Sequence, residues 1–148
     1  MQLIIMRHGQ ASCLAPSDQE RVLTETGRAE VIRTVSGMNK LPVNRVISSP
    51  YFRAKETAEI AASTFGCDIE LMDELVPEGN PQSIIDVLPQ SGVVLLASHM
   101  PVVSYLAGQL CDGVPSLGPF FQTASALLLE MEVMAAGMAR VKGSFYFG

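Results

Sequence analysis

The chain has 148 residues, of which 48% are hydrophobic and 17% charged, and its formal net charge is -5. This length fits one domain, and the apolar content is ample for a buried core, which excludes an intrinsically disordered chain. The acidic balance excludes non-specific binding to nucleic acid or to an anionic membrane, because both require a basic surface. We therefore expect a single domain over residues 1–148 that meets any anionic substrate through a local cationic pocket.

Three cysteines, Cys13, Cys67 and Cys111, lie far apart and form no Cys-x-x-Cys pair. An odd number at these spacings argues against a disulfide framework and against a zinc site. Residues 1–6 are apolar but lack the basic start and long apolar stretch of a signal peptide. Prolines and glycines interrupt the nearly uncharged stretch 87–129, which argues against a membrane span. The expected location is the reducing cytoplasm.

The first expected elements are a strand at residues 3–6 and a long helix. Thr24 is a suitable N-cap for this helix, which runs to about residue 38. Ile32 and Val35 are expected on one face of the helix.

Short apolar runs and helical patterns then alternate to the end of the chain. Strands are predicted at residues 45–47, 68–71, 93–97 and 126–131, with an edge strand at 138–147 after a turn at Gly137, and helices at about 50–66, 82–88 and 101–110. Apolar strands that are each followed by a helix are typical of a parallel sheet buried on both faces. The sequence therefore predicts an α/β fold, a three-layer α/β/α sandwich with a mostly parallel sheet.

Candidate functional residues follow three of the predicted strands. In open α/β sheets the ligand lies beyond the carboxyl ends of the strands. Arg7-His8-Gly9 follows the first strand, Ser48-Ser49-Pro50 leads from the second to Arg53, and Ser98-His99 follows the fourth. His8 and His99 are the only histidines of the chain. Two histidines at the same edge of a sheet favour a shared site over two separate structural roles.

These residue types suit phosphoryl transfer. A neutral imidazole is a competent nucleophile near pH 7, so His8 can attack phosphorus if a backbone carbonyl in the turn after Gly9 holds its other ring nitrogen. Arg7 and Arg53 supply permanent positive charge for the phosphoryl oxygens, which carry the charge of the transition state. His99 is expected to donate a further hydrogen bond as an imidazolium.

The motifs resemble those of the histidine phosphatase superfamily, also called the phosphoglycerate mutase-like superfamily. The resemblance rests on four ordered matches: Arg7-His8-Gly9, Leu23-Thr24-x-x-Gly27, Ser48-Ser49-Pro50-x-x-Arg53-Ala54-x-x-Thr57-Ala58, and Ser98-His99. It implies a phosphoglycerate mutase-like fold with His8 as the phosphorylated nucleophile, Arg7 and Arg53 as phosphate ligands, and His99 completing the pocket. It implies no cofactor.

Within the superfamily, the short chain and the segment Ser17-Asp18-x-x-Arg21-x-Leu23-Thr24 look most like the SixA branch. That resemblance implies a phosphohistidine phosphatase, whose substrate is a phosphorylated signalling protein such as a histidine-containing phosphotransfer domain. A chain this short also leaves no insertion to close over the pocket as a lid. Two alternatives remain open: a phosphatase of small phosphomonoesters on the same scaffold, and a non-catalytic phosphate-binding module.

The proton donor is not fixed by the sequence. Glu74 partly resembles the glutamate that serves as general acid in the broader family, and Glu78 and Asp18 are its rivals. An imidazole leaving group needs less help from an acid than an alkoxide does, so a weak or absent acid favours phosphohistidine as the substrate.

Arg21 is a further cationic residue, which either contacts the substrate or pairs with a nearby carboxylate. No metal is expected, since the site is cationic and offers no carboxylate cluster.

Overall fold

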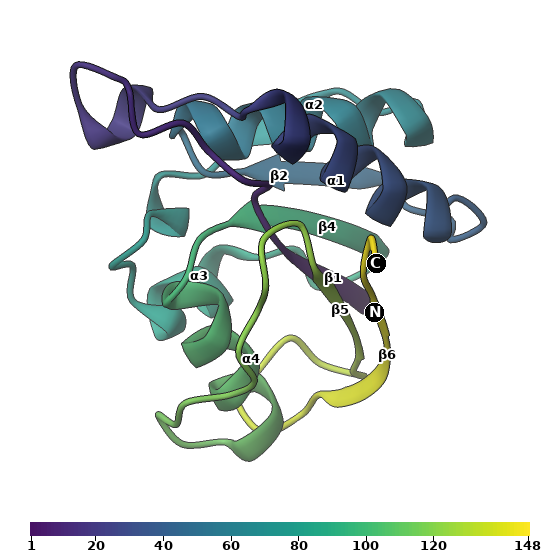
Figure 1. Cartoon of the computed structure of the whole chain (residues 1–148). Helices are drawn as coiled ribbons and strands as arrows, with labels where there is room; N and C mark the ends of the chain where they lie inside the picture. The colour runs from purple at the N-terminus through teal and green to yellow at the C-terminus, as the bar shows by residue number, and fades with distance from the viewer.

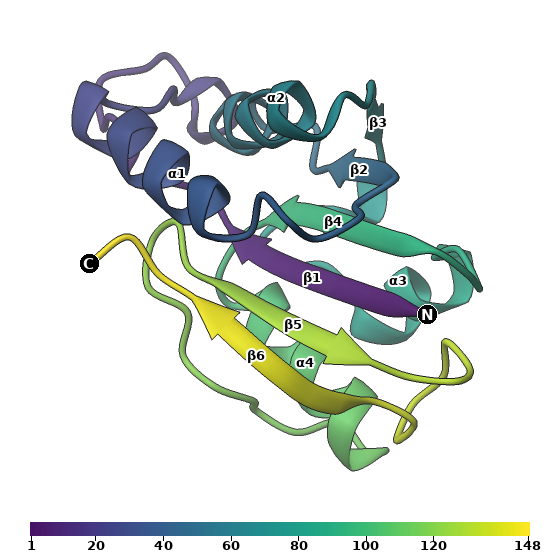
Figure 2. The same ribbon diagram turned by 90° about the vertical axis from the view of Figure 1, so that its right-hand side faces the viewer.

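One mixed sheet of six strands organises the computed structural model, which describes residues 1–148. The strands are β1 (Gln2–Arg7), β2 (Arg45–Ser48), β3 (Ile69–Leu71), β4 (Val93–Ser98), β5 (Ala126–Glu130) and β6 (Arg140–Phe145). They lie in the order β3-β2-β4-β1-β5-β6, and the first four pair in parallel. In Figure 2 the arrowhead of β5 points opposite to those of β1 and β6, because β5 is antiparallel to both of these neighbours. The predicted mostly parallel sheet is confirmed.

Two pairs of helices cover the sheet, one pair on each face (Figure 1). The helices are α1 (Glu25–Gly37), α2 (Phe52–Phe65), α3 (Pro81–Val87) and α4 (Val102–Asp112), with short 3-10 helices η1 (Asp18–Glu20) and η2 (Asp73–Leu75). Helices α1 and α2 lie on one face, and α3 and α4 lie on the other. The predicted three-layer sandwich is therefore confirmed. None of these helices combines the length and apolarity needed to cross a bilayer.

Strand β1 is buried on both faces because its apolar side chains alternate between the two helical layers. Leu3 and Ile5 pack in the cluster with α3 and α4, whereas Ile4 and Met6 pack in the cluster with α1 and α2. Successive side chains of a strand point to opposite faces, so a continuous apolar run serves both cores. This burial fixes the end of β1, where the candidate functional residues begin.

The burial of α1 and β3 shows which of their apolar residues reach the core. Ile32 is 52% exposed, and the face of α1 that packs on the core carries Val31 and Val35 instead. Residues four apart share a helix face, whereas Ile32 lies about 100° around the helix from Val31. Strand β3 is short and largely exposed, because it forms an edge of the sheet.

Two glycines bring α1 close to the segment after β1. Thr24 caps α1, its side chain accepting a hydrogen bond from the Gly27 amide at 2.9 Å, as predicted. A Cβ atom on Gly27 would lie 2.0 Å from the backbone oxygen of Gln10, and one on Gly9 would lie 2.6 Å from the backbone oxygen of Gly27. Both positions therefore exclude a larger side chain, and their contact holds the turn after His8 against the helix.

Candidate active site

The register of the parallel strands brings the two histidines together. Arg7 of β1 pairs with Ser98 of β4, so His8 and His99 each lie one residue beyond a paired position. Their ring centroids are 5.2 Å apart, with the ring planes inclined at 61°. The two strand-end histidines thus share one site, at the carboxyl edge of the sheet.

Hydrogen bonds assign the proton of His8 to Nδ1. This nitrogen lies 2.7 Å from the backbone oxygen of Gly9, which can only accept, so Nδ1 carries the hydrogen and Nε2 carries the lone pair. The Nε–H of Arg53 donates to Nε2 at 3.2 Å. The expected carbonyl partner is therefore present, and it is that of Gly9 itself. The nitrogen that faces the cationic side chain is the one able to attack.

The protein also keeps His8 neutral. The pKa of His8 is lowered from 6.5 to about 4, mainly by burial and further by the charges of Arg53 and Arg7, with the Gly9 carbonyl acting in the opposite direction. A pKa of about 4 leaves the imidazole unprotonated at neutral pH. Nε2 then needs no general base to uncover its lone pair, which becomes available for attack when its hydrogen bond with Arg53 is released.

Thr57 is a site residue for which the sequence predicted no role. Its hydroxyl accepts a hydrogen bond from the Gly9 amide at 3.2 Å and donates to the backbone oxygen of Arg53 at 2.8 Å. Thr57 therefore ties the turn after His8 to the helix that carries Arg53. The signal was the four-residue spacing of Arg53 and Thr57, which places both on one face of a helix.

The two predicted arginines, Arg53 and Arg7, come from two different elements of the fold. Arg53, in the first turn of α2, is buried and reaches His8, while Arg7 is half-buried at the end of β1. Nη1 of Arg7 donates to the backbone oxygen of Phe121 at 2.8 Å, and its Nε is buried without a hydrogen-bond partner. Such an unpaired buried donor is costly and marks a position where an anion would be bound favourably.

The surroundings of His99 favour its neutral form over the imidazolium that the sequence suggested. It is 1% exposed, and its pKa is lowered to about 2, first by burial and then by the charges around it. Nε2 of His99 lies 2.7 Å from the hydroxyl oxygen of Ser49, which also accepts the Tyr51 amide at 3.2 Å. The hydroxyl oxygen has a second lone pair, but only donation to Nε2 uses the Ser49 hydroxyl hydrogen, so we assign the proton of His99 to Nδ1.

This Nδ1 nitrogen of His99 is buried and has no partner in the chain. A neutral His99 can therefore still donate one hydrogen bond to an oxygen that enters the pocket. Ser49, which fixes this tautomer, belonged to a motif noted in the sequence but had been given no function of its own.

The candidate proton donors differ in their surroundings. The carboxylate of Asp18 accepts from Arg21 at 3.1 Å and from Arg53 at 3.2 Å, and these contacts hold its pKa below the usual value, so Asp18 is ionised at neutral pH. Arg21 thus makes the ion pair that was one of its two expected roles. Glu78 is exposed, whereas Oε2 of Glu74 is buried without a partner. Asp18 is therefore unsuited to be the acid.

Glu74 lies in η2, which packs against the end of β4. The Ser98 hydroxyl donates to the backbone oxygen of Leu75 at 2.8 Å, so this helix lies beside the strand that leads to His99. The position of η2 beside this strand makes Glu74 better placed than Glu78 to act as the proton donor.

No group of three or more His, Cys, Asp or Glu side chains is arranged to hold a metal ion.

Comparison with known proteins extends over nearly the whole chain. The chain is 33% identical over 146 residues to "Phosphohistidine phosphatase SixA" of Escherichia coli (strain K12), an alignment that covers 93% of this chain and 89% of that protein. It is 32% identical over 126 residues to the SixA homolog of Haemophilus influenzae, covering 74% and 77% of the two chains.

A solved structure of the protein histidine phosphatase SixA complexed with tungstate matches this fold with a TM-score of 0.89 and 30% identity. The match covers 99% of this chain and 97% of that one. The family model described as "Histidine phosphatase superfamily (branch 1)" matches residues 3–76, which include His8, Arg7 and Arg53. By sequence and by fold, this chain belongs to the histidine phosphatase superfamily.

Proposed function

We propose that this chain is a phosphohistidine phosphatase, a hydrolase that removes phosphate from a phosphorylated protein histidine through a covalent phospho-His8 intermediate. The observation that carries the proposal is the state of His8, whose Nδ1–H is held by the Gly9 carbonyl while its Nε2 lone pair faces the guanidinium of Arg53. The similarity to proteins named phosphohistidine phosphatase supports the choice of substrate.

The reaction has two displacements at phosphorus. In the first, Nε2 of His8 forms a bond to phosphorus, the bond from phosphorus to the substrate imidazole breaks, and the departing nitrogen takes a proton. Arg7, Arg53 and the Nδ1–H of His99 are placed to hold the phosphoryl oxygens, on which the transition-state charge accumulates. In the second, water attacks phosphorus, releases inorganic phosphate and returns His8 to its starting form.

An imidazole leaving group lowers the demand for a strong general acid. Asp18 is held ionised by two arginines and cannot protonate a leaving atom at neutral pH. An imidazole departs with less assistance than an alkoxide, whose loss depends on a proton donor worth about 10²- to 10⁴-fold in rate. This difference favours phosphohistidine over sugar phosphates or phosphoserine.

The proposed partner is a phosphorylated signalling protein, such as a histidine-containing phosphotransfer domain, in the cytoplasm. The three cysteines are free, which suits a reducing compartment. The absence of an inserted domain between the elements that carry His8 and Arg53 supports a macromolecular substrate, since no such domain covers the site.

A substrate panel tests the function. The values of kcat/KM are measured for a phosphohistidine protein, a phosphoserine peptide, a phosphotyrosine peptide and a sugar phosphate. The expected result is a clear preference for the phosphohistidine protein. A preference for a phosphomonoester would replace the proposed substrate class, and binding without release of phosphate from any substrate would indicate a phosphate-binding module instead.

A further inference from the structure

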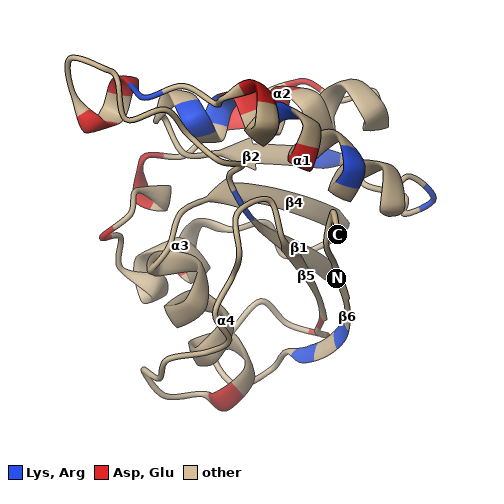
Figure 3. Ribbon diagram, viewed as in Figure 1, with Lys and Arg blue, Asp and Glu red and all other residues tan.

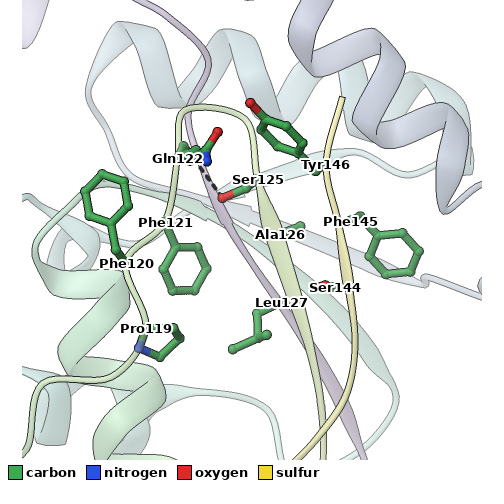
Figure 4. Close-up of a pocket in the computed structure, with 10 residues that line it drawn as sticks. All are labelled: Pro119, Phe120, Phe121, Gln122, Ser125, Ala126, Leu127, Ser144, Phe145 and Tyr146. Carbon is green, nitrogen blue, oxygen red and sulfur yellow. Dashed lines mark hydrogen bonds between the residues drawn. The ribbon is translucent and has the colours of Figure 1, made fainter. Parts of the chain in front are cut away.

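A groove of about 360 Å³ lies beside the active site, between the loop after α4 and the carboxyl end of β6 (Figure 4). Its lining is mainly aromatic and aliphatic and consists of Pro119, Phe120, Phe121, Gln122, Ser125, Ala126, Leu127, Ser144, Phe145 and Tyr146. In Figure 4 the side chains of Phe120 and Phe121 project from the loop on one side, and those of Phe145 and Tyr146 lie at β6 on the other.

The loop that forms one wall is bonded directly to the catalytic segment. Its Phe121 carbonyl accepts from the Arg7 guanidinium at 2.8 Å, and its Ala124 amide donates to the backbone oxygen of His8 at 2.9 Å. The Arg7 amide in turn donates to the backbone oxygen of Ser125 at 3.0 Å. The groove therefore begins where the phosphate site ends, and Arg7 belongs to the boundary between them.

The groove exposes aromatic surface and carries no charge. Phe120 is 72% exposed and Tyr146 is 49% exposed, and none of the ten lining residues is Asp, Glu, Lys or Arg. Charged residues gather instead on α1 and α2, whereas α3, α4 and the loop after α4 carry few (Figure 3). Exposed aromatic side chains around an uncharged hollow are typical of a surface that binds an apolar group of another molecule.

We propose that this groove binds an apolar side chain of the phosphorylated protein, close in sequence to its phosphohistidine. The inference rests on the proposed function and names the second point at which the substrate is held. Cζ of Arg7 lies 5.9 Å from the centroid of the Phe120 ring. Side chains three or four apart on a helix are separated by about 5–6 Å, so a helical substrate whose phosphohistidine meets Arg7 reaches the Phe120 edge of the groove with such a side chain.

Three variants test the groove. Phe120→Ala and Tyr146→Ala each remove one aromatic wall, and Tyr105→Ala removes a tyrosine of similar exposure, 42%, on α4 outside the groove. Steady-state rates are measured with a phosphohistidine protein and with phosphoramidate, a small P–N compound that occupies the phosphate site alone. Each groove variant is expected to raise KM for the protein by roughly 5- to 30-fold, the effect of losing an aromatic anchor. Hydrolysis of phosphoramidate and the behaviour of Tyr105→Ala should match the wild type.

The outcomes separate the groove from the catalytic proposal. If the wild type hydrolyses the phosphohistidine protein but both groove variants keep its KM, the groove is not a substrate site. If the groove variants instead convert a dimer to a monomer in sedimentation and keep KM, a second copy of the chain occupies the groove and the inference is overturned. Failure of the wild type on every phosphohistidine protein overturns the proposed function itself.

Discussion

Arg53 and Asp18 are joined by two contacts across the mouth of the active site. Nη1 of Arg53 donates to the backbone oxygen of Asp18 at 2.6 Å, and Nη2 donates to its carboxylate at 3.2 Å. The third donor, Nε, faces His8. Every nitrogen of this guanidinium therefore has a partner, although Nη1 and Nη2 each keep a second N–H. In the proposed mechanism, the Asp18 carboxylate competes with a phosphoryl group for the positive charge of Arg53.

Replacement of Asp18 by Asn is expected to strengthen anion binding. The change removes the competing negative charge. Because the Asp18 side chain is exposed and screened by solvent, its ion pairs contribute about 0–1 kcal/mol, and inorganic phosphate should bind up to about fivefold more tightly. Product inhibition by phosphate measures this affinity. Glu20→Gln is the matched control, since Glu20 lies on the same short helix but pairs with Ser17 rather than Arg53. Weaker phosphate binding by Asp18→Asn would mean that Asp18 orients Arg53 instead of competing with substrate.

Replacement of Ser49 by Ala should impair catalysis through His99. Without the hydroxyl, Nε2 of His99 loses its partner and the tautomer with hydrogen on Nδ1 is no longer fixed. Loss of a buried hydrogen bond costs about 1–3 kcal/mol, which corresponds to a fall of about five- to hundredfold in kcat. Ser49→Thr, which keeps the hydroxyl, should retain most of the activity. The ¹⁵N chemical shifts of the His99 ring measure the tautomer directly, and identical shifts in wild type and Ser49→Ala would contradict this role.

The two buried histidines should make stability depend on pH. Both have pKa values below 6.5 in the folded chain, about 4 for His8 and about 2 for His99, so the unfolded chain binds more protons between pH 6.5 and 4. The free energy of unfolding therefore falls as the pH is lowered through this window, by about 1.4 kcal/mol per pH unit for each histidine. Urea unfolding at a series of pH values measures the slope. In His99→Gln this slope should fall by the contribution of one histidine. An unchanged slope would show that the pKa of His99 is not lowered in the folded chain.

Gly27 should tolerate no side chain. A Cβ atom there would lie 2.0 Å from the backbone oxygen of Gln10, and neither backbone can yield without moving the turn after His8. Gly27→Ala should destabilise the fold by about 1–3 kcal/mol, the usual cost of overpacking, and should lower activity as well. Gly143→Ala on β6 is the control, because a Cβ atom at that position meets nothing within 4 Å. Equal thermal stability of the two variants would rule out the close contact.

The sequence predicted the layers and the meeting of the two histidines because both follow from local patterns. Apolar runs marked the strands, and parallel strands place the residues that follow them at one edge of the sheet. Prediction failed where a property depends on contacts made across the chain. The neutrality of His99 follows from tertiary burial, and the contact of Asp18 with Arg53 joins residues 35 positions apart through an irregular loop. Neither the spacing of residues along the sequence nor their type predicts such tertiary contacts.

Trapping of the phosphoenzyme tests the nucleophilic role of His8 most directly. The protein is mixed with a ³²P-labelled phosphohistidine protein, quenched rapidly in base, and digested to locate the label. The predicted result is an acid-labile, base-stable phosphate on the peptide that contains His8, absent from a folded His8→Ala variant. A label found on the His8→Ala enzyme itself, or one carried by the enzyme peptide that contains His99, would contradict the proposed mechanism.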